Sequence, residues 1–320
     1  MGIKRINGGF ELNCQLIVVP DRKMEKDQFE GSIFKMKSKA VIVATGGKAS
    51  PALSSDGLGY PLCKALGHSM NRMYPAIVRL RTENILGGSI SGVKIETKLK
   101  LLQVLLATKD TAEKREVIAE ESGELLFTDE GISGPPVLQL AGRMNHELAG
   151  FATHTSSLVS YYILADFLPE YTKEQLTNLL IRRMTALSAR SISRYLDGLL
   201  PSKLAKAISS KLFGTHPARQ VSSLTSLEMA RIQSFLKSMP IKITGTAGWD
   251  AAQVTAGGIR LNEIKTETME STQCAGLYIT GEILDVTGDC GGYNLQFAWA
   301  SGQFAGEAAA AKICNLNKRE

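Results

Sequence analysis

The sequence lacks the features that mark several large classes of protein. Its 320 residues contain no uninterrupted apolar run of about 18 residues, the length that a membrane-spanning helix needs, and no apolar signal-peptide core follows the first residues. The five cysteines are odd in number and no two form a Cys-x-x-Cys pair, which favours free thiols in a reducing compartment over a disulfide framework. We therefore expect a cytoplasmic protein without a membrane partner.

Catalytic and metal-binding signatures are scarce as well. None of the four histidines has Glu or Cys neighbours at metal-ligand spacing, so no metal is expected. No Gly-x-Ser-x-Gly elbow occurs, and residues 131–136 are interpreted as a rigid loop. The 37 basic and 31 acidic side chains give a net charge of +6, but the basic residues are dispersed and are not interleaved with aromatics. This composition predicts no nucleic-acid partner.

What is present suits a globular protein of two domains. Both ends of the chain predict α/β structure, whereas the middle predicts β-strands followed by helices. The expected strands near the ends are residues 10–19, 29–37, 40–44, 241–244, 254–261 and 277–280, and the expected middle has a small barrel or sandwich over 76–165 and helices over 173–239. The simplest interpretation is a discontinuous domain interrupted by a β-plus-α insertion.

The most informative stretch lies near the end of the chain, where an apolar strand enters a glycine-rich loop and then a helix rich in alanine. A glycine turn before a helix N-terminus presents backbone N–H groups and a positive dipole end, which suit an anion or an electron-rich ring. A helix cap alone would need one glycine and no cluster of carboxylates. The candidate cofactor-binding residues here are Gly281, Glu282, Asp285, Gly291, Gly292, Tyr293 and Asn294.

A second glycine turn follows the continuously apolar residues 41–44. Thr45, Gly46 and Gly47 either form a plain turn after a buried strand or let the backbone approach a ligand closely. Cys290 precedes the last helix, at a place that favours a thiolate, so a thiol redox role stays an alternative to a small residue that fits the loop.

The motifs together resemble those of one family, the YhiN/BaiN-type flavoproteins, which are FAD-dependent, NAD(P)-linked oxidoreductases. The matching segments follow one another over most of the chain and are residues 44–48, 55–60, 123–128, 131–136, 254–258, 268–271 and 281–301. The resemblance implies an α/β fold: an FAD/NAD(P)-binding domain of the two-dinucleotide-binding type, with an inserted β-barrel plus helical domain. The expected boundaries are 1–78 with 262–320 for the FAD domain, and 79–261 for the insertion.

The resemblance also implies roles for the candidate residues. Thr45, Gly46 and Gly47 would line the FAD near its pyrophosphate and ribityl, and Glu282 and Asp285 would lie beside the ribityl and phosphates. Residues 291–294 would contact the pyrimidine edge of the flavin ring. A small-molecule substrate would lie at the flavin face, with residues 254–258 as one wall and NAD(P)H as the electron donor. No catalytic acid or base is assigned, and Tyr293 is only a candidate proton donor.

One departure from the family pattern is the absence of any Gly-x-Gly-x-x-Gly fingerprint. The expectation is therefore an incomplete FAD site, completed by a missing N-terminal segment or by a second chain. The alternatives are a non-catalytic fragment that needs a partner segment, and a thiol redox protein that uses Cys290.

Overall fold

The computed structural model describes residues 2–15, 33–84, 86, 90–107, 112–150, 159–214 and 219–317. Parts of two expected strands, residues 16–19 and 29–32, lie outside the described residues. The chain divides into two compact units: unit 1 comprises Met1–Pro75 with Gln253–Glu320, and unit 2 comprises Ala76–Ala252. The second division falls earlier than the expected 261/262, because β12 (Val254–Ile259) pairs with β5 (Met70–Ala76) and so belongs to unit 1.

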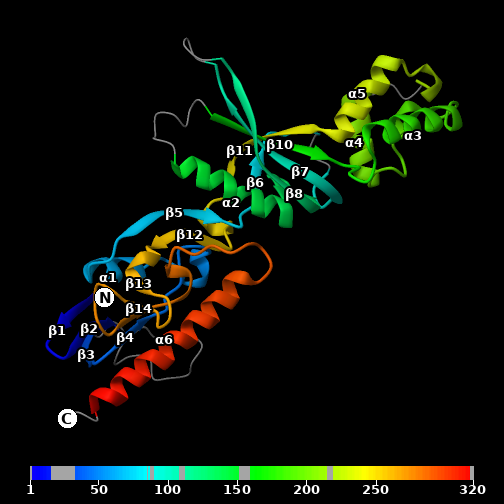
Figure 1. Ribbon diagram of the computed structural model, residues 1–320. Helices are drawn as coiled ribbons and strands as arrows, with labels where there is room; N and C mark the ends of the chain where they lie inside the picture. Colours follow the sequence, from blue (N-terminus) through cyan, green and yellow to red (C-terminus); the bar gives the residue numbers. More distant parts are fainter. Residues whose placement is uncertain are drawn as a thin grey trace. The chain divides into compact units, whose positions relative to one another are not determined.

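Unit 1 contains two further sheets (Figure 1). The first is antiparallel, with β1 (Gly2–Ile6), β2 (Gly9–Gln15) and β3 (Ile33–Ser38) in that order. The second has the order β13-β14-β15-β4 and comprises β13 (Ile264–Lys265), β14 (Glu270–Ser271), β15 (Leu277–Ile279) and β4 (Val41–Val43). The helical elements of this unit are η1 (Pro51–Leu53), α1 (Gly59–Ala65), η6 (Leu261–Glu263), η7 (Gly281–Ile283) and α6 (Tyr293–Asn317).

The central pair of this second sheet, β4 and β15, is parallel, with Val41 opposite Leu277 and Val43 opposite Ile279. Both strands are short apolar runs, as a strand covered on its faces requires. The core of the unit forms around β15, whose three residues are buried, and includes Phe10, Tyr60, Ile283 and Ala305. The outer edge of β4 has no strand beside it among the described residues, and Ile42 is 42% exposed.

Unit 2 is built on a closed barrel with the strand order β10-β11-β6-β9-β8-β7. Its strands are β6 (Leu80–Thr82), β7 (Lys94–Leu105), β8 (Lys114–Phe127), β9 (Gly131–Ser133), β10 (Val159–Asp166) and β11 (Met239–Thr246). Apolar residues alternate along the long strands so that Leu99, Leu101, Leu125 and Phe127 are buried. Helix α2 (Pro135–Gly150) packs on the barrel, and η5 (Trp249–Ala251) follows β11.

Helices α3 (Lys173–Ala186), α4 (Ser202–Phe213) and α5 (Ser226–Lys237) extend the barrel unit, with η3 (Ile192–Arg194) and η4 (Val221–Ser223) between them. Both α3 and α5 begin with a capping box, in which Thr172 pairs with Gln175 and Thr225 pairs with Glu228. Within the described ranges, no helix combines the length and the apolar character that crossing a membrane requires.

Candidate functional site

Two glycine turns meet at one edge of the sheet in unit 1. Because β4 and β15 are parallel and in register, their carboxyl ends lie at the same edge. β4 leads into Thr45, Gly46 and Gly47, and β15 leads through Thr280 into η7, which starts at Gly281. Ligands of α/β sheets bind at such carboxyl edges, where loops can present backbone groups. Residues 45–47 and residues 281 and 282, from opposite ends of the chain, are therefore brought together.

Thr255 and Glu282 hold the first of these turns in place. The Thr255 hydroxyl oxygen accepts hydrogen bonds from the backbone N–H groups of Lys48 (2.7 Å) and Ala49 (3.0 Å), while the Thr255 N–H donates to Glu282 Oε1 (3.0 Å). A Cβ atom at Gly47 would lie 2.3 Å from Thr255 Oγ1 and 2.4 Å from Glu282 Oε1. Glycine at this position is thus explained by close packing inside the protein. The sequence analysis had singled out Thr255 only as part of a pocket wall.

Thr45 and Tyr60 belong to the same neighbourhood. A Cβ atom at Gly59 would lie 1.9 Å from Thr45 Oγ1, so α1 approaches the turn closely at its first residue. Tyr60 is 2% exposed, and its hydroxyl has no hydrogen-bond partner within the described chain. Burial raises the pKa of Tyr60 above its usual range, and the negative charges of Glu282 and Asp285 raise it further. Tyr60 therefore carries its proton at neutral pH and is an unused donor beside the two turns.

Asp285 connects the second turn to β5 and β12. Asn71 donates from its side-chain amide to Asp285 Oδ2 (2.6 Å), and Arg260 Nε donates to Asn71 Oδ1 (3.0 Å). The backbone N–H of Asp285 donates to Ile259 O (2.9 Å). One oxygen each of Glu282 and Asp285 is thereby engaged by the protein itself.

The loop before α6 is open at its glycines. Gly291 and Gly292 are exposed and have φ values of +131° and +95°, which disfavour other residues, and a Cβ atom at Gly292 would meet nothing within 4 Å. The Asn294 side chain fixes the loop by accepting from Gly288 N (2.8 Å) and donating to Gly288 O (3.0 Å). At the start of α6, Gln296 N donates to Gly292 O, and the first N–H groups of a helix have no acceptor within the helix itself.

Large apolar side chains are exposed on the first half of α6. Tyr293 is 65% exposed, Leu295 61% and Trp299 69%. An exposed tyrosine and tryptophan next to an open glycine loop offer ring surfaces for a flat ligand or for another polypeptide segment.

A buried Ser–His–Glu chain lies elsewhere in unit 1. His68 is hydrogen-bonded through Nδ1 to Glu263 Oε2 (2.9 Å) and through Nε2 to Ser271 Oγ (2.8 Å). The Ser271 oxygen already accepts from the backbone N–H groups of Gln273 and Cys274, so its proton points to His68. All three side chains are buried, which denies a substrate access to the serine. This chain fastens α1 and β5 to β14 and is no nucleophilic site.

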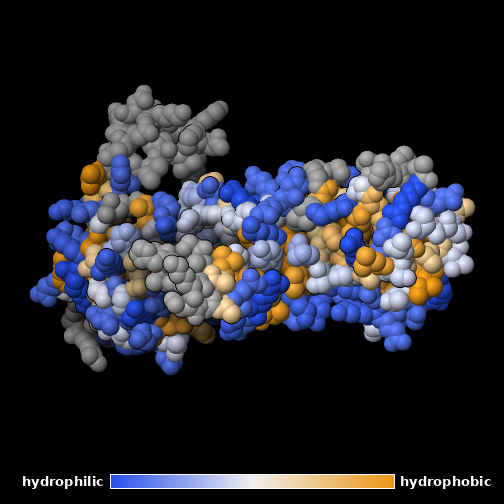
Figure 2. All heavy atoms as spheres, turned by 90° about the horizontal axis from the view of Figure 1, so that it is seen from above, coloured by the Kyte–Doolittle hydropathy of each residue, from blue (hydrophilic) through white to orange (hydrophobic). Residues whose placement is uncertain are grey.

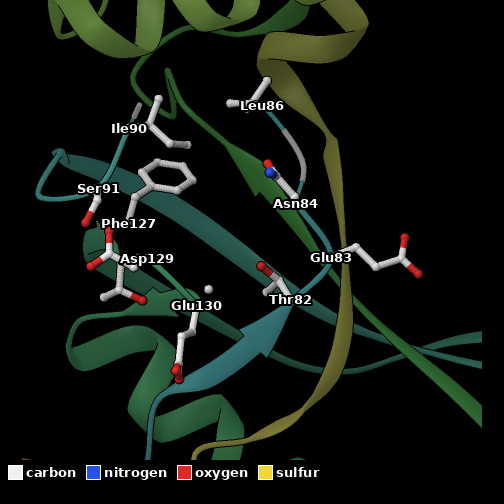
Figure 3. A pocket seen from close by; sticks show the side chains of 11 residues that line it. Thr82, Glu83, Asn84, Leu86, Ile90, Ser91, Phe127, Asp129 and Glu130 are labelled. Atoms are coloured by element: carbon white, nitrogen blue, oxygen red, sulfur yellow. The ribbon is translucent and has the colours of Figure 1, made fainter. Parts of the chain in front are cut away.

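Unit 2 has its own small cavity of about 130 Å³, between the end of β6 and the turn from β8 to β9 (Figure 3). Phe127 and Ile90 form its apolar side, and Asp129 and Glu130 approach it from the turn. Glu83 points away from it and pairs with Lys242 (2.6 Å). No group of residues able to hold a metal ion occurs in the described parts of the chain. None of the residues proposed from the sequence lines this cavity.

None of the cysteines, all of which lie in the described parts of the chain, forms a disulfide. Cys290, the candidate redox thiol, is half-buried in the loop before α6, and Cys63 and Cys274 are buried in the core of unit 1.

Comparison with known proteins places the chain in a family. The family model described as the HI0933-like protein Rossmann domain matches residues 4–308. A 3-dehydro-bile acid delta(4,6)-reductase of Clostridium scindens is 36% identical over 273 residues, which cover 84% of this chain and 62% of the relative. Ribosomal RNA dihydrouridine synthases of Escherichia coli and Haemophilus influenzae are each 29% identical, over 261 and 266 residues, and each alignment covers 82% of this chain and 58% of the relative.

The chain therefore belongs to the HI0933-like family and has the α/β fold of its Rossmann domain. The resemblance to the YhiN/BaiN-type proteins, stated from the motifs, is confirmed at this level. The chain spans about three fifths of the length of the curated relatives it matches.

Proposed function

We propose that unit 1 binds FAD at its two glycine turns, and that the chain serves an oxidoreductase in which hydride passes from NAD(P)H through FAD to an organic substrate. The observation that supports this proposal is that β4 leads into residues 45–47 and β15 leads into residues 280–283 at the same edge of two adjacent parallel strands. Family membership and the reductase named among the relatives support the same cofactor chemistry.

The residues present suit a dinucleotide with a flat ring. Gly292 leaves open space where a side chain would stand, and the Tyr60 hydroxyl is a buried donor in need of an acceptor. The turn at Thr45, Gly46 and Gly47 would hold the pyrophosphate and ribityl part, and the free oxygens of Glu282 and Asp285 would accept from ribityl hydroxyls. The N-terminus of α6, with Tyr293 and Asn294, would face the pyrimidine edge of the ring and stabilise negative charge there.

When bound, FAD would supply the hydride chemistry, and the chain's own residues would orient it and exclude water. The names of the relatives suggest the class of reaction. A reductase acting on delta(4,6) bonds and a synthase of dihydrouridine both saturate a carbon–carbon double bond. We extend this to the present chain as reduction of an electron-poor double bond in a small organic substrate. Unit 2, the barrel with its helices, would then be the inserted domain.

The edge of β4 suits a further strand. Its outer edge is unpaired among the described residues, and the exposed Ile42 would gain cover from a neighbour. We propose that an additional segment, in the same polypeptide or from a second chain, pairs there and completes the adenosine side of the FAD site. A protein without catalytic function and a thiol redox protein using Cys290 are not favoured by the family, although Cys290→Ser tests the latter directly.

Titration with FAD, followed by flavin absorbance and fluorescence, tests the proposal. Gly292→Val places a β-branched side chain at φ +95° in the open space and should abolish flavin binding. Gly306→Ala is the control, because it adds a methyl group within α6, the helix that follows Gly292, at a position that is also open. Equal FAD binding by the wild type and a folded Gly292→Val variant would refute this assignment.

A further inference from the structure

The hydroxyl group of Tyr60 is a buried polar group that the described chain does not use. Tyr60 is the second residue of α1, is 2% exposed, and belongs to the same cluster of core residues as Val43 and Ile283. Its hydroxyl has no hydrogen-bond partner within the described chain. Burying a hydroxyl without a partner costs free energy, and native proteins contain few such groups. Phenylalanine would fill the same space without this cost, so the hydroxyl has a use outside the folding of the chain.

Close packing around the two glycine turns fixes the position of Tyr60. A Cβ atom at Gly59 would lie 1.9 Å from Thr45 Oγ1 and 2.8 Å from a side-chain atom of η7. Because residue 59 is glycine, α1 begins in contact with both the turn after β4 and the turn after β15. Burial raises the pKa of Tyr60, and the negative charges of Glu282 and Asp285 raise it further, so the hydroxyl keeps its proton.

Glu282 and Asp285 each have one oxygen that the protein does not engage. Glu282 Oε1 accepts from Thr255 N (3.0 Å), and Asp285 Oδ2 accepts from the side-chain amide of Asn71 (2.6 Å). The other oxygen of each carboxylate receives no hydrogen bond from the described parts of the chain. A carboxylate can only accept, whereas the protonated hydroxyl of Tyr60 needs an acceptor. One neighbourhood therefore combines a donor with two anionic acceptors.

An alcohol matches this combination better than a charged group does. A hydroxyl group can donate to a carboxylate and at the same time accept from Tyr60. A phosphate only accepts and carries negative charge, so the two carboxylates would repel it. A cation would pair with the carboxylates but would leave the phenolic proton of Tyr60 without an acceptor. Hydroxyl groups on neighbouring carbon atoms would satisfy both carboxylates and Tyr60 together.

We infer that Tyr60, Glu282 and Asp285 form a polyol site that holds the ribityl hydroxyl groups of the flavin, with Tyr60 donating to one hydroxyl oxygen. The inference rests on the flavin site proposed above, and it assigns to Tyr60 a role that the motifs did not suggest. It also specifies which part of FAD lies here. The ribityl chain contacts these three side chains, and the phosphates lie away from them.

A hydroxyl-rich ligand finds no comparable set of groups in the cavity between α3 and α5. This cavity of about 400 Å³ is lined mostly by apolar side chains, among them Leu180, Ile181 and Met229, and by no carboxylate. Figure 2 shows hydrophobic residues gathered in this part of unit 2, at the right of the view. Such a lining suits an apolar ligand. Flavin bound there through its ring would show no dependence on Tyr60.

Thermal unfolding of the protein without ligand is the first test. Tyr60→Phe removes only the unpartnered hydroxyl, so the melting temperature of this variant should equal or exceed that of the wild type. A lower melting temperature of Tyr60→Phe without ligand would overturn the inference, because it would show that the hydroxyl already has a partner in the folded chain.

Fluorescence titration with three flavins is the second test. Riboflavin lacks the phosphates and the adenosine of FAD, and lumiflavin carries a methyl group in place of the ribityl chain. Tyr60→Phe should weaken binding of FAD and of riboflavin equally, by roughly 3- to 10-fold, the contribution of one hydrogen bond, and should leave binding of lumiflavin unchanged. Tyr278→Phe is the matched control. It removes another buried phenolic hydroxyl of unit 1, beside Glu270, and should leave all three affinities unchanged.

The outcomes separate this inference from the flavin proposal. No binding of any of the three flavins to the wild type would refute the flavin site and the polyol site together. Equal flavin affinities of the wild type and Tyr60→Phe, or an equal loss for riboflavin and lumiflavin, would refute only the role of Tyr60. A loss confined to FAD, or binding of FAD but not of riboflavin to the wild type, would place the main contacts at the phosphates and would overturn the polyol site.

Discussion

Replacing Thr255 by valine should loosen the first glycine turn while preserving the shape of the side chain. The hydroxyl oxygen of Thr255 is the acceptor for Lys48 N and Ala49 N, and Thr255 is fully buried, so water cannot take its place. An unsatisfied buried donor costs about 1–3 kcal/mol. Ala49 is buried and Lys48 is half-buried, so losing the acceptor for both should lower the free energy of unfolding of unit 1 by roughly 2–4 kcal/mol.

Hydrogen–deuterium exchange resolves this effect at the turn itself. The amides of Lys48 and Ala49 should lose protection in Thr255→Val, and the urea midpoint of unit 1 should fall. Thr255→Ser is the matched control, because it removes a methyl group but retains the acceptor, so protection of both amides should persist. Unchanged exchange of these two amides in a folded Thr255→Val variant would show that the hydroxyl does not hold the turn.

Three further perturbations probe other contacts of unit 1. Burial would raise the pKa of Glu270. Hydrogen bonds from Lys312, Gly276 N and Lys265 outweigh burial and lower this pKa from an ordinary value near 4.5 to about 2. The lowered pKa corresponds to at most about 3 kcal/mol of stability. This contribution to stability is complete above the pKa of the carboxyl in the unfolded chain and is lost as pH falls toward 2. Glu270→Gln should therefore destabilise the protein at pH 7 and flatten the curve of stability against pH in acid. Parallel curves for the variant and the wild type would disprove this role of Glu270. Glu263→Gln should also destabilise the protein at pH 7, because hydrogen bonds from Ser69 and His68 outweigh burial and lower the pKa of the Glu263 carboxyl. Calorimetry at pH 7 and pH 4 checks whether the difference in stability from the wild type shrinks in acid. Gly59→Ala should lower the free energy of unfolding by about 1–3 kcal/mol, because the added Cβ clashes with Thr45 Oγ1. Adding Thr45→Gly should recover most of that stability in thermal unfolding. No recovery in the double variant would show that the clash lies elsewhere.

The local patterns of the sequence predicted much of unit 1. The apolar run ending at Thr45 and the one ending at Thr280 became β4 and β15, because a continuously apolar segment followed by glycine is typical of a covered parallel strand. The final helix begins at Tyr293, as expected from the glycines before it and the alanines after it.

Other features depend on contacts that one sequence does not display. The hydrogen bond from Lys48 N to Thr255 Oγ1 joins residues 207 positions apart, and no periodic pattern in the sequence predicts such a bond. Helix α2 was missed for a different reason: Pro135 and Pro136 were interpreted as part of a rigid loop, whereas proline is also well suited to the first turn of a helix, where no N–H is needed.

The most direct test of a flavin site in unit 1 is amide hydrogen–deuterium exchange of the purified chain with and without FAD. We predict that FAD slows exchange in two segments at once, residues 45–49 and 281–294, and that Gly292→Val removes both effects. No protection in either segment, or protection confined to residues 82–91 and 127–131 around the cavity of the barrel, would contradict a flavin site built from the two glycine turns.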